Sequence, residues 1–156
     1  MKSGFFVDIN LTPPVVTIDG HLSISSLFWE RVKARPQRVA IREKDFGIWN
    51  EYSWSDWGDF AKWVGLGLTS LGFSRGDVCS IASEVNKEWM FADLGVITMG
   101  GVTNGVYPTD APNQVEYLIT DSGTRFYFAE DEEQLDKVLE VRERTPTLEK
   151  IIIFDM

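Results

Sequence analysis

The spacing of apolar residues changes near residue 78, and the part before it predicts two amphipathic helices. The segment SISSLFWERVKARP is typical of a helix that Ser25 or Ser26 would cap and Pro36 would end. A second helix is expected from about residue 55 to residue 71. Apolar residues and a glycine recur there every three or four positions, the spacing of one buried face, at Trp57, Phe60, Val64, Gly67, Leu68 and Leu71.

Between these helices, the segment VAIREKDFGIWNEYSW predicts a β-hairpin. Its turn is expected at residues 45–47, where Gly47 suits a backbone with φ above zero. Four tryptophans gather in the hairpin and the helix after it. They predict one core or cover layer, with a partner interface as the alternative; they are Trp49, Trp54, Trp57 and Trp63.

After residue 78, short apolar runs alternate with helical patterns. Strands are expected at 78–83, 102–107, 125–129 and 151–154, and helices at 87–99, 110–120 and 132–144. This alternation is typical of a parallel sheet. The predicted fold class is therefore α/β, a mostly parallel sheet covered by helices and preceded by a helix and a β-hairpin. Residues 1–24 are expected to form an irregular N-terminal arm.

Two polar segments, SEVN and YPTD, follow the first two predicted strands of this sheet. Parallel strands end at one shared edge, where ligands bind in α/β proteins. We therefore single out Glu84, Asn86, Tyr107 and Thr109 as candidate substrate-binding residues.

A structural interpretation of the same residues stays open. Pro108 ends a strand because its nitrogen carries no hydrogen. Thr109 or Asp110 can cap the next helix, a contribution of about 1 kcal/mol. Ser122 and Gly123 are likewise typical turn residues, and such residues need no function.

Composition and charge narrow the function classes. The 156 residues suit one domain, and the net charge of −9 disfavours nucleic acid and anionic membrane surfaces as partners. No apolar run approaches the roughly 20 residues that span a bilayer, and the first residues lack a signal-peptide core. We therefore expect no transmembrane segment and a cytoplasmic location.

Few residues are candidates for catalysis or metal binding. Cys79 and His21 are the only cysteine and histidine, so neither a disulfide nor a Cys/His metal site can form within one chain. Cys79 is expected to be a small buried residue and His21 to lie in the surface arm. Asp93 lies in a very apolar predicted helix, so it must be paired or hydrogen-bonded, or its pKa must rise. The residues themselves predict no catalytic set and no metal site.

The combined motifs resemble the N-terminal part of the AMP-forming acyl-CoA synthetases, which belong to the adenylate-forming superfamily. The resemblance covers residues 25–156 and favours the long-chain fatty acid–CoA ligases. It rests on RPQRVAIREKD, on YSWSDWGDFAKWVGLGLTSLGFSRGDVCSIAS, and on the NKEW, GG, YPT and DSG motifs of residues 86–123.

The resemblance implies a reaction that these 156 residues do not complete. ATP, Mg²⁺ and coenzyme A would convert a fatty acid, through an acyl-adenylate, to its CoA thioester. The family's phosphate loop, adenine and magnesium motif, ribose-binding Asp and catalytic Lys match nothing here. The chain is therefore expected to be an N-terminal subdomain truncated before the phosphate loop. Alone it would be inactive, bind none of these cofactors and self-associate through uncovered apolar surface.

Two other functions remain open from the sequence. One is a stand-alone, non-catalytic α/β binding module with a synthetase-like fold. The other is an interaction module that uses the tryptophan-rich region to hold a partner or a second copy. Fold alone does not decide between them.

Overall fold

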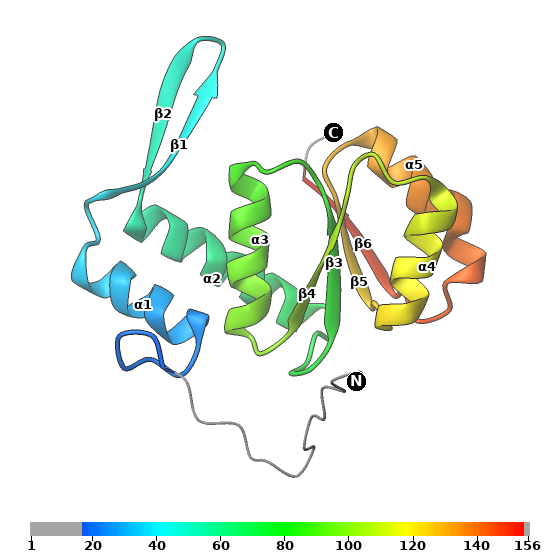
Figure 1. Ribbon diagram of the computed structural model, residues 1–156, viewed down its shortest axis with the longest axis horizontal. Coiled ribbons are helices and arrows are strands. Elements are labelled where there is room, and N and C mark those ends of the chain that lie inside the picture. Colours follow the sequence, from blue (N-terminus) through cyan, green and yellow to red (C-terminus); the bar gives the residue numbers. More distant parts are fainter. Residues whose placement is uncertain (1–16, 155–156) are drawn as a thin grey trace, which may run out of the picture.

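The computed structural model describes residues 17–154, which form six strands, five α-helices and one short 3₁₀ helix (Figure 1). The helices are α1 (Ile24–Ala34), α2 (Trp54–Ser70), α3 (Lys87–Thr98), α4 (Pro112–Ser122), α5 (Glu132–Val141) and η1 (Arg142–Arg144). The strands are β1 (Val39–Asp45), β2 (Ile48–Ser53), β3 (Val78–Ala82), β4 (Val102–Val106), β5 (Phe126–Ala129) and β6 (Lys150–Ile153).

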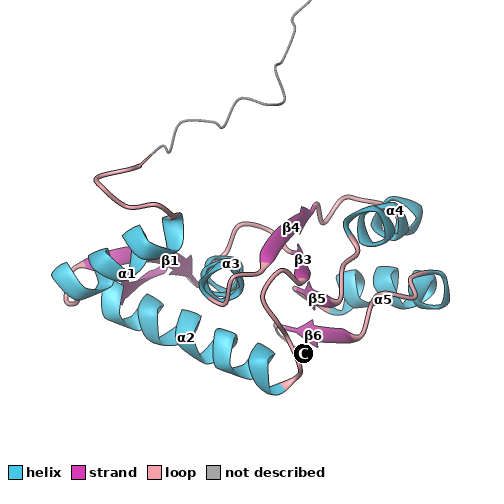
Figure 2. Ribbon diagram, turned by 90° about the horizontal axis from the view of Figure 1, so that it is seen from below, coloured by secondary structure: helices cyan, strands magenta, loops and turns pink. Residues whose placement is uncertain are grey.

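The last four strands form one parallel sheet in the order β4-β3-β5-β6. Helices α2 and α3 cover one face, and α4 and α5 cover the other (Figure 2). All four residues of β5 are buried, because this strand has a neighbour on each side and helices over both faces. The predicted α/β fold class and the preceding helix and hairpin are confirmed.

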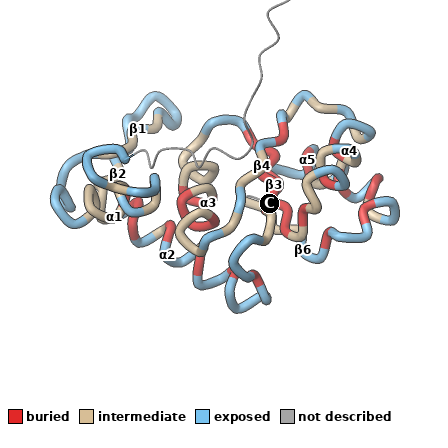
Figure 3. The backbone as a smooth tube through the Cα atoms, turned by 60° about the horizontal axis from the view of Figure 1, so that its bottom comes forward, coloured by how far each residue is buried: buried red, intermediate tan, exposed pale blue. Residues whose placement is uncertain are grey.

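The hairpin of β1 and β2 stands away from the sheet (Figure 1). Phe46 and Gly47 both have positive φ, 44° and 85°, as a two-residue hairpin turn requires. The predicted turn is therefore confirmed. Large apolar side chains are exposed near this turn, where Phe46 is 99% and Trp49 61% accessible. Most residues around them are exposed as well (Figure 3).

The prediction that four tryptophans form one core or cover layer is wrong. Trp54 and Trp57 stack with ring centroids 5.5 Å apart, beneath α1. Trp63 is 60% exposed on the outer face of α2, and Trp49 lies on the hairpin beyond the reach of that cluster. Of these four tryptophans, only Trp54 and Trp57 at the start of α2 therefore belong to a core cluster.

The prediction of the buried face of α2 is also partly wrong, because Gly67 and Leu71 are exposed. The contact between α2 and α3 runs instead through small residues, Ala61, Gly65 and Gly95. A Cβ atom added at Gly95 would lie 2.7 Å from Val64. The spacing of large apolar residues did not predict this face of α2, because two helices can pack this closely only where their side chains are small.

Two predicted helix caps are corrected. Ser23, rather than Ser25 or Ser26, caps α1 and accepts a hydrogen bond from the Ser26 backbone nitrogen at 3.1 Å. Neither Thr109 nor Asp110 caps α4, which begins two residues later at Pro112. Proline suits the first position of a helix because its missing N–H has no partner there.

The segment before α1 is only partly described. Residues 1–16 of the expected irregular arm lie outside the described residues. Ile18 and His21 form an isolated antiparallel bridge across a turn, and the helix begins one residue earlier than the expected boundary. Within residues 17–154, no helix combines the length and apolarity that crossing a membrane demands.

The DSG motif connects α4 to the sheet. The Ser122 hydroxyl lies 2.7 Å from that of Thr124, which lies 2.7 Å from the Ser80 hydroxyl on β3. Asn104 of β4 donates to Ser80 at 3.0 Å. Gly123 ends the helix with φ 68°, a left-handed conformation that glycine adopts without strain. These contacts support the structural interpretation of the motif.

Candidate functional site

The four candidate residues lie at the carboxyl edge of the sheet, where the parallel strands end. Ala82 of β3 pairs in register with Val106 of β4. The segments 83–86 and 107–110 therefore leave the sheet side by side at this edge (Figure 1). The structure thus brings Glu84, Asn86, Tyr107 and Thr109 to one end of two neighbouring strands.

Asn86 holds the loop after β3 together. Its amide nitrogen donates to Ser83 Oγ at 3.0 Å and to Glu130 Oε1 at 3.1 Å. Its amide oxygen accepts from the backbone nitrogen of Trp89 at 2.8 Å and so caps α3. With all these positions in use, Asn86 shapes the edge rather than offering free hydrogen-bonding capacity to a ligand.

Glu84 lies in the same loop, with its side chain exposed to solvent. Its backbone nitrogen donates to Glu130 Oε2 at 2.7 Å. Glu130 follows β5 directly, and its carboxylate therefore bridges the ends of two adjacent strands. Sequence reasoning missed Glu130, although its place after a predicted parallel strand is the same signal that singled out Glu84.

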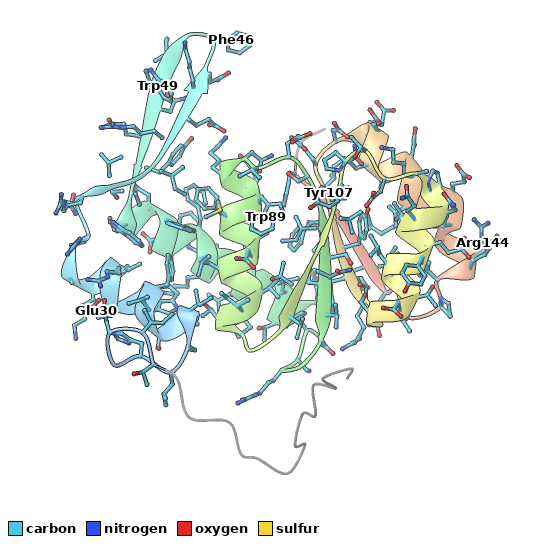
Figure 4. The ribbon with its side chains drawn as sticks, viewed as in Figure 1. Glu30, Phe46, Trp49, Trp89, Tyr107 and Arg144 are labelled. Carbon is cyan, nitrogen blue, oxygen red and sulfur yellow. The ribbon has the colours of Figure 1, made fainter. Side chains whose placement is uncertain are left out.

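The loop after β4 is a tight turn that presents two side chains to solvent. Asp110 accepts from the Tyr107 backbone nitrogen at 3.1 Å, and its own nitrogen donates to the Tyr107 carbonyl at 2.9 Å. Lys137 of α5 donates to the Pro108 carbonyl. Tyr107 is 76% exposed and Thr109 is also exposed, so both remain accessible to a ligand (Figure 4).

Tyr107 borders a shallow pocket of about 390 Å³ beside α4. The pocket is otherwise lined by residues of β4 and α4 and the turn between them, namely Gly105, Asp110, Asn113, Gln114, Tyr117 and Leu118. The aromatic rings of Tyr107 and Tyr117 and the amides of Asn113 and Gln114 give it both apolar and polar surface. This pocket can hold a small part of a ligand that is bound at the carboxyl edge of the sheet.

A second pocket at this edge, of about 520 Å³, is rich in carboxylates. It is lined by residues of the hairpin, the start of α3 and the strand ends, namely Glu43, Asn86, Lys87, Glu88, Glu130, Asp131 and Phe154. Lys87 Nζ lies 2.8 Å from a carboxylate oxygen of Glu43 and 2.8 Å from one of Glu88. The sequence pattern gave no sign that the hairpin contributes Glu43 to this edge.

The charges in this pocket fix the state of Lys87. Burial alone would lower the pKa of Lys87, but hydrogen bonds to Glu43 and Glu88 outweigh it, and the pKa is raised. Lys87 is therefore a paired cation that holds the hairpin against α3. It is not available as a proton acceptor near neutral pH.

The remaining titratable candidates are structural. Cys79 is fully buried, as predicted, and burial raises the pKa of its thiol. Burial likewise raises the pKa of Asp93 in α3, one of the outcomes expected for it. Across residues 17–154, no three His, Cys, Asp or Glu side chains converge in a way that could hold a metal ion.

A family model described as AMP-binding enzyme matches residues 28–156 of the chain. Among curated proteins, the long-chain-fatty-acid–CoA ligase FadD15 of Mycobacterium tuberculosis is 26% identical over 140 residues, or 90% of this chain and 23% of that protein. The long-chain-fatty-acid–CoA ligase ACSBG2 of Xenopus laevis is 28% identical over 145 residues, or 93% of this chain and 19% of that protein. The chain thus spans about a fifth of the length of these relatives.

Solved structures share the fold. The anthranilate CoA ligase AuaEII, in complex with anthranoyl-AMP, superposes with a TM-score of 0.77 at 22% identity, over 83% of this chain and 24% of that one. The N-terminal domain of FACL13 from Mycobacterium tuberculosis gives a TM-score of 0.76 at 18% identity, over 84% of this chain and 33% of that one.

Proposed function

The chain belongs to the AMP-binding enzyme family, and from this we propose that it is the N-terminal portion of an ATP-dependent acyl-CoA synthetase. The whole enzyme would activate a long-chain fatty acid, through an acyl-adenylate, to the CoA thioester. The observation that carries the proposal is the match of the family model to residues 28–156, almost all of the described structure.

The choice of a long-chain substrate rests on the relatives. The curated proteins that match over most of this chain are named long-chain-fatty-acid–CoA ligases. The shared fold does not add to this choice, because the anthranilate CoA ligase has the same fold and is named for an aromatic acid. Acyl chain length is therefore the property that a substrate panel must measure.

Residues 25–156 would act mainly as scaffold, as a subdomain of the AMP-binding domain. Of the four candidate substrate-binding residues, Glu84, Tyr107 and Thr109 are exposed, whereas Asn86 is used to form the loop. We assign the direct contact with substrate to Tyr107 and Thr109, and a positioning role to Asn86. Glu84 contributes its backbone to the same loop.

The carboxyl edge does not fit the phosphates of ATP. Four carboxylates surround its second pocket, and they are Glu43, Glu88, Glu130 and Asp131. Its one cation, Lys87, is already paired with two of them. Carboxylates repel phosphate oxygens. ATP and coenzyme A would therefore be held by parts of the enzyme outside this chain, and the resemblance implies that the magnesium motif lies there too. We expect this chain alone to bind none of the three and not to catalyse.

Solution behaviour follows from the same proposal. We place the enzyme in the cytoplasm, with a fatty acid as substrate and no nucleic acid partner. Residues 17–154 expose large apolar side chains on the hairpin and on the outer edge of β4, including Phe46, Ile48, Trp49 and Val102. We therefore expect the 156-residue chain by itself to self-associate despite its net charge of −9.

The exposed hairpin tip also favours a second function, that of an interaction module. Phe46 is fully accessible, and Ile48 and Trp49 are more than 60% accessible beside it. A non-catalytic α/β module could hold a partner protein with this tip. Light scattering of the wild-type chain and of a Phe46→Ser/Trp49→Ser variant tests this function. If the variant no longer associates, association runs through the hairpin. If it associates as before, other exposed apolar surface is responsible.

Pyrophosphate exchange tests the proposed reaction. Protein from the complete reading frame that contains this chain is assayed with saturated carboxylates of 2 to about 18 carbons. We expect carboxylate-dependent exchange that increases with chain length, and no exchange by the 156-residue chain. Exchange confined to acetate or to aromatic acids would contradict the long-chain assignment.

A pair of variants tests the assigned residues. Tyr107→Ala should raise the KM for the acid by about tenfold, the effect of roughly 1.4 kcal/mol of lost binding energy. Trp63→Ala removes an exposed aromatic side chain on the outer face of α2, away from the pocket that Tyr107 borders; it is the control and should leave KM within about twofold of wild type. Equal effects of the two substitutions would remove the special role of Tyr107.

A further inference from the structure

A pocket of about 570 Å³ lies among α1, α2 and α3 and shares no residue with the two pockets at the carboxyl edge. Its size is typical of sites for small organic ligands. Its walls are mainly apolar, with charged side chains at the rim, and are formed by Ile24, Leu27, Phe28, Arg31, Arg35, Trp54, Trp57, Met90, Asp93 and Leu94.

The floor of this helix pocket is a fixed aromatic cluster. Phe28 packs edge-on against Trp57 with ring centroids 5.0 Å apart, and Trp54 stacks on Trp57 at 5.5 Å. The Trp57 indole nitrogen donates to the Met90 carbonyl at 3.2 Å, so its polar atom is satisfied. Phe28 and Trp57 are almost completely buried. The floor is therefore closely packed and apolar, as an alkyl chain requires.

The rim carries two arginines one helical turn apart, at the carboxyl end of α1. Arg31 is already paired with Asp19 at 2.9 Å and with Glu30 at 3.6 Å. Arg35 forms no ion pair within residues 17–154. A guanidinium binds a carboxylate through two parallel hydrogen bonds. Arg35 can therefore receive one such group at the mouth of the pocket.

We propose that the helix pocket binds one long-chain carboxylate, with the alkyl chain on the Phe28–Trp57 floor and the carboxylate on Arg35. This site is distinct from the carboxyl edge, and it stands or falls independently of the proposed synthetase activity. It would hold free fatty acid on the outside of the domain, away from the loops of residues 83–86 and 107–110.

The charges favour a monoanion over a phosphate ester. Only one of the two arginines is without a partner within the described residues, and Asp93 adds a carboxyl group to the pocket wall. A doubly charged head group would face this carboxyl group with one free guanidinium, whereas a carboxylate needs only Arg35. An uncharged alkyl chain would fill the pocket but leave Arg35 without an anion.

Quenching of tryptophan fluorescence tests the site directly, because Trp54 and Trp57 line it. The probe is 9,10-dibromostearate, whose bromines quench indoles on contact, added below its micelle concentration to the full chain. We expect saturable, one-site quenching. The alcohol with the same brominated chain should bind about tenfold more weakly, because it lacks the charge that Arg35 receives.

Three variants locate the binding. Arg35→Gln should weaken dibromostearate binding about tenfold and leave alcohol binding unchanged. Leu27→Glu, at a half-buried wall position, should abolish binding of both ligands. Arg144→Gln removes an exposed arginine at the other end of the molecule and serves as the matched control with wild-type binding (Figure 4).

Two results would overturn the proposal. If dibromostearate gives no saturable quenching, the acid does not occupy a defined site at Trp54 and Trp57. If quenching saturates but Arg35→Gln and Leu27→Glu leave it unchanged, the acid binds elsewhere, for example at the exposed Trp49 of the hairpin. Circular dichroism of each variant verifies that the fold is kept.

Discussion

Strand β5 and the tip of the β1–β2 hairpin carry similar side chains in opposite surroundings. Phe126 on β5 has no accessible surface, whereas Phe46 at the hairpin turn is 99% exposed. β5 pairs with a strand on each side and has helices over both faces. The hairpin has only two strands, and residues 44–51 around its turn are exposed to solvent. Burial is therefore decided by what covers a residue rather than by its apolarity.

The largest test of this comparison is a matched pair of phenylalanine substitutions. Phe126→Ala should lower the free energy of unfolding by about 3–5 kcal/mol, because it leaves a cavity between β5 and Phe73. Phe46→Ala should change it by less than about 0.5 kcal/mol. Urea unfolding followed by circular dichroism measures both. A large loss from Phe46→Ala would mean that the hairpin tip is covered in solution.

A second pair tests the close contact of α2 and α3. Gly95→Ala places a methyl group 2.7 Å from Val64 and 3.0 Å from the Ala61 carbonyl, and should cost about 1–3 kcal/mol. Gly67→Ala meets no atom within 4 Å and should stabilise α2 by about 0.5–1 kcal/mol, because alanine is the better helix former. If Gly67→Ala destabilises instead, the original expectation that Gly67 faces the core is right. Thermal unfolding of both variants separates the signs.

A smaller effect is expected where the hairpin is tied to the body. A double-mutant cycle of Glu43→Gln and Lys87→Met should give a coupling of about 0.5–1 kcal/mol, because both side chains are about three-quarters buried. The exposed pair of Arg42 and Glu51 within the hairpin should give about 0.2–0.5 kcal/mol in the same cycle. Equal coupling energies for the two pairs would show that burial of Glu43 and Lys87 does not strengthen their ion pair.

The smallest test uses pH. Because burial raises the pKa of Asp93, this group favours the folded state fully below the pKa of the unfolded chain, about 3.9. That contribution is lost as pH rises through the higher pKa of the folded state. Asp93→Asn cannot ionise, so its stability relative to wild type should be greater at pH 7 than at pH 4. An unchanged difference between the two pH values would mean that Asp93 is not desolvated.

The sheet was predictable because its signal is local. The run FYFA is apolar at every position and is bounded by turn residues, so burial on both faces could be read directly. Helix ends were harder. Residues near Ser23 and Pro112 are of types that suit a helix start equally well. Only the folded geometry shows which residue caps or begins the helix.

The candidate site was predictable only in position. The parallel order placed Glu84, Asn86, Tyr107 and Thr109 at one edge, as expected. The sequence could not show that Asn86 is fully used in the loop, or that Glu43 reaches Lys87 from a hairpin 44 residues away. Contacts of this kind depend on how the hairpin packs on α3, which no local pattern encodes.

The most direct test of the proposed synthetase is the coding sequence downstream of codon 156. The account predicts an open frame that continues into a loop rich in Thr, Ser and Gly and ending in Lys, as the resemblance implies. A stop codon immediately after codon 156 would contradict it. The chain would then lack the residues that the family uses to activate a carboxylate, and the binding-module function would take its place.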